Sequence, residues 1–103
     1  MQYCVDHDMP FMFVTEVTTR TAPVVIKMIY GQALDMGAAR LVVCDTCGHV
    51  TPDGTRALIQ FVRQIAIDHG KPDVQIDWHG HQDRGLGVIN SIAAYEAGAD
   101  RLH

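Results

Sequence analysis

Short apolar runs alternate with longer helical patterns along this chain, and no other feature constrains its fold as strongly. The runs Pro10–Glu16, Arg40–Cys44 and Asp73–Trp78 have the length and the branched or aromatic content of strands. A segment with helical spacing follows each run, and a glycine closes each helical segment. Because parallel strands need a crossover between them, this repeated order predicts an α/β fold with a parallel sheet.

The helical segments carry start and stop signals. In the first, we expect Thr21 as the N-cap, Pro23 in the first turn and Gly37 at the end. Its predicted buried face comprises Val25, Ile29, Ala33 and Met36.

The second helical segment is bounded by Thr51 as N-cap, Pro52 at the first position and Gly70 as the stop. Its predicted face comprises Leu58, Val62, Ile65 and His69. A third helix is predicted within residues 85–99, closed by Gly98, and residues 100–103 are expected to begin another strand.

A weak internal repeat relates Ala33–Leu41 to Ala94–Leu102, since each contains a helix end, a glycine and the start of a strand. Repeated βα units fit either a closed barrel or a doubly wound open sheet. Periodicity alone does not choose between these two architectures.

Composition narrows the class of protein. The chain has 103 residues, 48% of them apolar and 19% charged, which is a globular composition, whereas a complete α/β barrel needs about 200 residues or more. The net charge is −4 and there is no Lys or Arg run, so nucleic acid and anionic membranes are not expected partners. With no apolar run long enough for a membrane span, no secretion signal and an odd cysteine count, we expect a cytoplasmic protein with reduced thiols.

Polar side chains gather where the predicted strands end. Glu16 ends the first strand, Asp45 and Thr46 follow the second, and His79 and His81 follow the third. Functional groups in parallel α/β folds collect at the carboxyl ends of strands, so these residues predict one shared site.

His79 and His81 carry the sharpest chemical signal. Residues i and i+2 at a strand end project to the same side, so both imidazoles can face one point. Neutral imidazole is a common ligand of divalent metals, and Gly80 between the two histidines permits close approach. The alternative is that both are ordinary polar loop residues; a metal site would also need a carboxylate from elsewhere.

The other strand-end residues are weaker signals. Glu16 is a candidate general base, or a glutamate that simply reaches solvent. Asp45 and Thr46 either bind a substrate carboxylate or carbonyl, or cap the turn before Pro52.

Cys44 and Cys47 form a C-x-x-C pattern with His49 close by. A redox pair or half of a zinc site is one interpretation. A buried apolar packing role for Cys44 is favoured, because it ends an apolar run and the chain has no second C-x-x-C pattern.

Three stretches together resemble an enzyme family. Residues 13–20 (FVTEVTTR), 44–52 (CDTCGHVTP) and 78–103 (WHGHQDRGLGVINSIAAYEAGADRLH) are similar, in order, to the fifth, sixth and seventh strand motifs of the 2-isopropylmalate synthase and homocitrate synthase group. The resemblance implies part of a (β/α)8 TIM barrel with about three βα units and parallel strands. Gln82 and Val17 depart from the pattern, since many relatives have Asn and an acidic residue there.

The resemblance also implies a function: Claisen-type condensation of acetyl-CoA with a 2-oxo acid at a divalent metal, which is Mn, Mg or Zn, as in leucine and related amino-acid biosynthesis. By the same resemblance, His79 and His81 are metal ligands, Thr46 contacts the 2-oxo acid and Glu16 is the catalytic acid/base. The family's remaining metal ligand, an aspartate of the first barrel strand, has no counterpart here, so we expect residues 1–103 to be a fragment of a catalytic domain, inactive alone and homo-oligomeric in its full-length form.

Two alternatives remain open at this stage. One is a related metal-dependent lyase or aldolase, similar to hydroxymethylglutaryl-CoA lyase, that cleaves a carbon–carbon bond. The other is a non-catalytic α/β module that keeps the barrel motifs only as scaffold.

Overall fold

A computed structural model describes all residues from 1 to 103. Its sheet contains four parallel strands in chain order: β1 (Met12–Val14), β2 (Arg40–Asp45), β3 (Gln75–Gly80) and β4 (Arg101–Leu102). The connecting helices are α2 (Pro23–Asp35), α3 (Pro52–Asp68) and α4 (Gly87–Glu96). The predicted α/β class is confirmed: three βα units lead to a short fourth strand.

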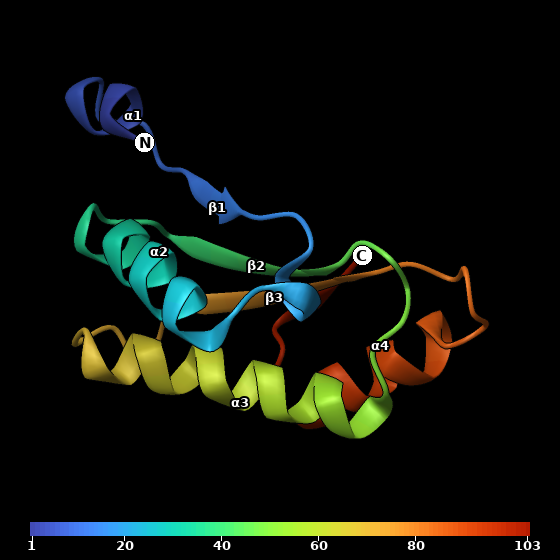
Figure 1. Cartoon of the computed structure of the whole chain (residues 1–103). Coiled ribbons are helices and arrows are strands. Elements are labelled where there is room, and N and C mark those ends of the chain that lie inside the picture. Colours follow the sequence, from blue (N-terminus) through green and yellow to red (C-terminus); the bar gives the residue numbers. More distant parts are fainter.

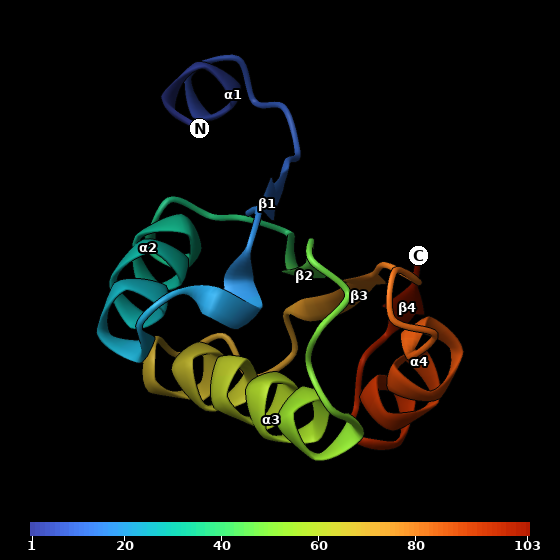
Figure 2. The same ribbon diagram turned by 45° about the vertical axis from the view of Figure 1, so that its right-hand side comes forward.

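The three long helices lie on one face of the sheet, and no long helix covers the other face (Figure 1). In Figure 2 the helices follow one another in an arc around the strands. Alternate residues of β2 and β3 point into the core cluster shared with the helices. These residues are Leu41 and Val43 of β2 and Ile76 and Trp78 of β3, and all four are fully buried. Burying each such side chain contributes about 1.5–3 kcal/mol, so these two strands anchor the layer of helices.

Helix α2 differs from its predicted form in two ways. Its N-cap is Ala22 and not Thr21, because a residue before proline favours extended backbone and the helix begins at Pro23. The predicted buried face is correct only at Ala33, and Val25 is exposed. The buried residues are Ile26, Tyr30, Gly31, Ala33 and Leu34. Apolar residues on several sides of this helix left more than one face consistent with the sequence.

Helix α3 agrees well with the prediction. The Thr51 side chain accepts a hydrogen bond from Gly54 N at 3.2 Å, and Pro52 is the first helical residue. Val62 and Ile65 are buried as expected, whereas Leu58 is only half-buried. The buried residues are Thr55, Ile59, Val62, Ile65 and Ala66.

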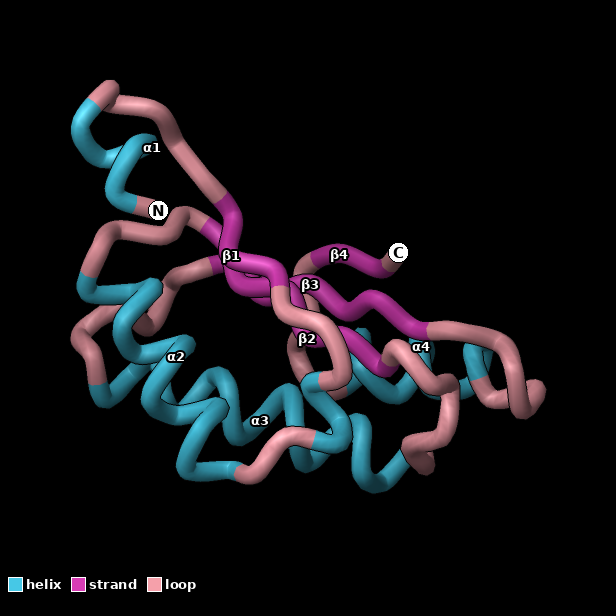
Figure 3. Tube along the Cα trace, turned by 45° about the horizontal axis from the view of Figure 1, so that its top comes forward, coloured by secondary structure: helices cyan, strands magenta, loops and turns pink.

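Strand boundaries shift by a few residues. β1 is shorter than predicted because it pairs only with β2, over three residues. β3 runs two residues further than predicted, so His79 and Gly80 lie inside the strand. The short helix α1 (Gln2–Asp6) and the 3-10 turn η1 (Thr18–Arg20) were not predicted, and α1 stands apart from the sheet (Figure 3). No helix has the length and apolar character needed to cross a membrane.

Candidate functional site

The carboxyl ends of the strands form one edge, and the predicted site residues lie along it. Glu16 lies two residues beyond β1, Thr46 directly follows β2, and His79 lies in β3 with its Cα paired to that of Cys44. The geometric part of the site prediction therefore agrees with the structure: all these groups are at the same end of the sheet.

A cavity of about 290 Å³ opens at this edge, on the face of the sheet that carries no long helix. It is lined by Met12, Val14, Thr15, Glu16, Val42, Cys44, Thr46, His79 and His103. The residues of β1 and β2 in the lining are apolar or, for Cys44, weakly polar, whereas Thr15, Glu16 and Thr46 lie just beyond the carboxyl ends of these strands. Water and charged groups are therefore favoured at the rim and disfavoured at the floor.

His79 and His81 face each other at the rim. Their Nε2 atoms are 3.2 Å apart and the rings meet edge-on, with centroids 5.0 Å apart. Two imidazole ligands bound to one metal ion at about 2.0–2.1 Å in tetrahedral geometry have their nitrogen atoms about 3.3 Å apart. The pair therefore has the spacing of two neighbouring ligands on one ion, and equally that of a hydrogen bond between two neutral rings.

The surroundings of His79 favour its neutral ring. Burial lowers the pKa of the His79 imidazole below its ordinary value, and the nearby rings of His81 and His103 lower it further. Since only the unprotonated imidazole can bind a metal, this shift widens the pH range in which His79 is a competent ligand.

The two rings would supply part of a coordination shell. No group of three or more His, Cys, Asp or Glu side chains in the chain lies close enough together to bind a metal ion. A divalent ion fits the spacing and the donor chemistry of His79 and His81, and further ligands would have to complete the shell.

The loop after β1 is held close to Thr46. Val17 N donates a hydrogen bond to Thr46 Oγ1 at 2.7 Å, so the Thr46 hydroxyl proton is free to donate elsewhere. Val17 has a φ of 54°, which is unusual for a β-branched residue and indicates local strain. The strained loop presents the exposed carboxylate of Glu16 at the cavity.

Asp45 serves the fold and does not line the cavity. Its carboxylate is fully buried and accepts hydrogen bonds from Thr19 Oγ1 at 2.8 Å and from Val50 N at 3.2 Å. His49 Nδ1 lies 3.4 Å from the same carboxylate. Of the two interpretations left open by the sequence, the turn-capping role is therefore the one that the structure supports for Asp45.

The two cysteines of the C-x-x-C pattern have different surroundings. Cys44 is buried at the cavity, where burial and then the charge of Glu16 raise the pKa of its thiol. Cys47 is exposed, and all three cysteines of the chain are free. Cys44 thus behaves as the small packing residue that the sequence favoured.

Sequence reasoning missed His103, which directly follows β4 and lines the cavity. Its Nε2 lies 3.0 Å from an oxygen of the fully buried Asp77 carboxylate, which Arg40 also contacts. The His103 ring centroid is 6.0 Å from that of His79. The sequence held a signal for this role, because His103 follows the apolar Leu102 as His79 follows the apolar Trp78. The signal was missed because only the beginning of the fourth strand was predicted.

Comparisons with known proteins agree with this geometry. The chain is 46% identical over 66 residues to 4-hydroxy-2-oxovalerate aldolase 2 of Azoarcus sp., covering 64% of this chain and 18% of the relative. It is 35% identical over 103 residues to the probable 2-isopropylmalate synthase of Methanopyrus kandleri, covering all of this chain and 19% of the relative. The chain thus spans about a fifth of the length of these curated relatives.

The fold also matches solved structures. The carboxyl transferase domain of Rhizobium etli pyruvate carboxylase with pyruvate superposes with a TM-score of 0.78 at 17% identity, covering 99% of this chain and 18% of that chain. At this identity the likeness shows the fold alone, that of a TIM barrel. Residues 2–103, which are nearly the whole chain, match the HMGL-like family. The chain therefore belongs to the HMGL-like family.

Proposed function

We propose that this chain carries part of the active site of a metal-dependent synthase that condenses acetyl-CoA with a 2-oxo acid, as a 2-isopropylmalate synthase does. One observation carries the proposal: His79, which lines the cavity with Glu16 and Thr46, has its Nε2 3.2 Å from Nε2 of His81. The arrangement combines a metal-ligand pair, a carboxylate and a hydroxyl donor at one strand edge.

In this proposal His79 and His81 hold a divalent metal, Mn, Mg or Zn, which when bound supplies Lewis-acid polarisation of a carbonyl group. The Thr46 hydroxyl donates a hydrogen bond to a carboxylate oxygen of the 2-oxo acid and so orients it. Glu16 is the acid/base group that takes a methyl proton from the acetyl thioester; the resulting enolate attacks the keto carbon, and the keto oxygen takes up a proton. Water then hydrolyses the thioester, which releases the CoA thiol. Met12, Val14 and Val42 give the cavity an apolar floor.

An aldolase is the second candidate. The chain is 46% identical to an aldolase over 66 residues and 35% identical to a synthase over 103 residues. The higher identity favours the aldolase, and the longer match favours the synthase. Both reactions form or break a carbon–carbon bond next to a polarised carbonyl, so the same four residues serve either one. The choice depends on which substrate the rest of the barrel admits.

The 103 residues are proposed to be one part of a longer barrel, whose remaining strands complete both the sheet and the metal site. The whole protein is proposed to act in the cytoplasm as a homo-oligomer. Acetyl-CoA and a 2-oxo acid are its proposed small-molecule partners.

The decisive experiment uses the intact protein. Thiol release from acetyl-CoA is measured with a panel of 2-oxo acids, and pyruvate release from 4-hydroxy-2-oxo acids is measured in parallel. We expect the His79→Ala, His81→Ala double variant to lose about 10²-fold or more in turnover, because Lewis-acid stabilisation is worth several kcal/mol. Thr46→Ala is expected to impair mainly the use of the oxo acid.

His69→Ala is the matched control. His69 lies at the other end of the molecule, where its Nδ1 is 2.8 Å from Asp35 Oδ1. Normal turnover in the double variant would overturn the proposed metal site, and pyruvate release without thiol release would replace the synthase by the aldolase.

A further inference from the structure

The backbone carbonyl of His81 is enclosed by two glycines from different segments. A Cβ built on Gly48, in the turn after β2, would lie 3.0 Å from His81 O and 3.1 Å from Asp83 N. A Cβ built on Gly87, the first residue of α4, would first meet the Gln82 side-chain oxygen and would lie 3.2 Å from His81 O. Carbon and oxygen atoms that are not bonded rarely pack this closely, so a side chain at Gly48 must displace backbone, whereas one at Gly87 must displace the Gln82 side chain and press on His81 O.

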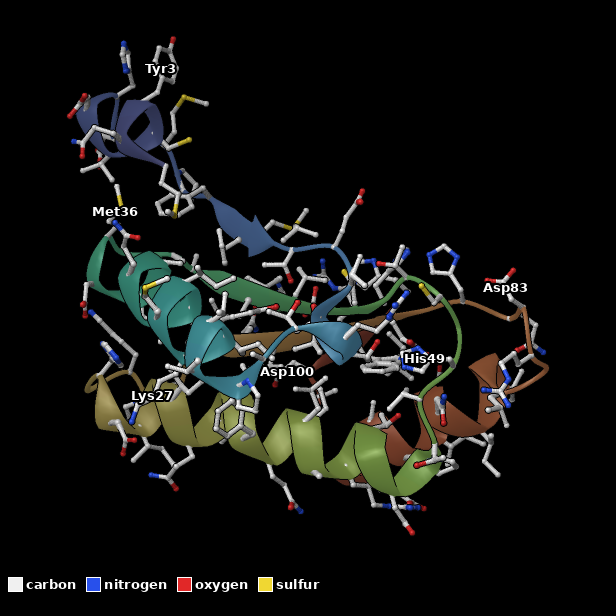
Figure 4. The ribbon with its side chains drawn as sticks, in the orientation of Figure 1. Tyr3, Lys27, Met36, His49, Asp83 and Asp100 are labelled. Atoms are coloured by element: carbon white, nitrogen blue, oxygen red, sulfur yellow. The ribbon has the colours of Figure 1, made fainter.

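Hydrogen bonds within the turn hold the backbone that follows His81. The Gln82 side-chain oxygen accepts a hydrogen bond from Gly87 N, and Gln82 O accepts one from Gly85 N at 2.9 Å. In Figure 4, Asp83 lies at the tip of this turn and His49 in the neighbouring turn after β2, at the same end of the molecule. A new side chain at Gly48 would therefore push against backbone atoms and not against a flexible side chain.

We infer that Gly48 and Gly87 are positioning residues that fix His81 so that its Nε2 meets that of His79. A methyl group at Gly48 displaces the His81 backbone by a few tenths of an ångström, and one at Gly87 moves the Gln82 side chain and presses on His81 O. Either change opens the pair of imidazoles. The inference rests on the proposed function in one respect, namely that this pair binds the metal. Groups that orient metal ligands typically change affinity by about 10–100-fold when they are altered.

Gly48→Ala and Gly70→Ala form a matched pair of variants. Both glycines have positive φ, 59° and 70°, so alanine costs similar backbone strain at each. Only Gly48 has neighbours, because nothing lies within 4 Å of a Cβ at Gly70. In the intact protein, both variants should lower the melting temperature, Gly48→Ala by more because its methyl group also meets backbone atoms, but only Gly48→Ala should weaken Mn²⁺ binding, by about 10-fold or more in calorimetric titration.

Gly87→Ala keeps the test decisive if Gly48→Ala does not fold. Gly87 has no positive φ, alanine is a better helix former than glycine, and the first atom that the methyl group meets belongs to the flexible Gln82 side chain, so this variant should fold. We expect Mn²⁺ affinity to fall about 10-fold while the melting temperature holds, a combination that a merely structural role would not give.

Crystal structures of the metal-free variants separate this inference from the proposed function. The distance between His79 Nε2 and His81 Nε2 should depart from 3.2 Å in Gly48→Ala and Gly87→Ala and remain in Gly70→Ala. An unchanged distance, or unchanged Mn²⁺ affinity, in both test variants overturns the inference. If the parent protein binds no metal, the proposed function fails, and the distance alone still decides the positioning role.

Discussion

Tyr30→Phe tests whether buried hydrogen bonds hold the loop that bears Glu16 in place. Tyr30 of α2 is fully buried, and its hydroxyl donates to Val42 O at 2.7 Å and lies 2.8 Å from Thr15 Oγ1. Thr15 Oγ1 lies 2.7 Å from Thr18 Oγ1, which accepts from Cys44 N at 2.9 Å. This continuous chain of hydrogen bonds ties the segment that bears Glu16 to strand β2.

The expected loss follows from two hydrogen bonds. Each contributes about 0.5–1.5 kcal/mol net, and the buried partners lose their donor or acceptor, so Tyr30→Phe should lower the free energy of unfolding by about 1–3 kcal/mol. Burial raises the pKa of the Tyr30 hydroxyl, which therefore stays protonated and able to donate at neutral pH. The ring itself keeps its edge-on contact with Phe13, with centroids 5.4 Å apart, so packing should change little.

Urea unfolding of the intact protein measures this loss, with Tyr95→Phe as the control. Tyr95 on α4 is 69% exposed, and its replacement should change the unfolding free energy by less than about 0.5 kcal/mol. We also expect weaker turnover in Tyr30→Phe, because the loop that positions Glu16 is loosened. Equal stability of the two variants would refute the reasoning.

Three further predictions concern titration, reactivity and assembly. The pKa of His79 is lower in the folded protein than the ordinary 6.5, so as pH falls the unfolded chain takes up the imidazole proton first. The metal-free protein should therefore lose stability as pH falls through 6.5. His79→Gln should remove that part of the pH dependence in urea unfolding. Iodoacetamide at mildly alkaline pH should label the exposed Cys47 and spare the buried Cys44, whose thiol pKa is raised, as read by peptide mass spectrometry; rapid labelling of Cys44 in the native protein would contradict its burial. Expressed alone, residues 1–103 should self-associate and unfold without a sharp transition, because β1 and β4 each pair with only one strand and Met12 and Val14 are exposed; a monomer with cooperative melting in light scattering and calorimetry would count against the fragment hypothesis.

Local sequence signals were enough to predict much of the fold. Glycine stops, the Thr51–Pro52 helix start and the apolar run before Cys44 are decided by neighbours close in the chain, and the structure has them where the patterns indicate. The same holds for the shared direction of His79 and His81, because residues two apart at the end of a strand project to the same side.

Tertiary structure decided what lies between distant segments. Three features depend on elements tens of residues apart in the chain. They are the side of α2 that is buried, the choice of Thr46 over Asp45 at the cavity, and the position of Gly48 next to the His81 backbone. An almost uniformly apolar helix has no single preferred face, and a polar pair after a strand can turn either residue inward. Packing on the sheet selects the face of α2 that buries Tyr30, whose hydroxyl then donates to Val42 O. In the same way Asp45 is the residue that turns inward, because its buried carboxylate accepts a hydrogen bond from Thr19.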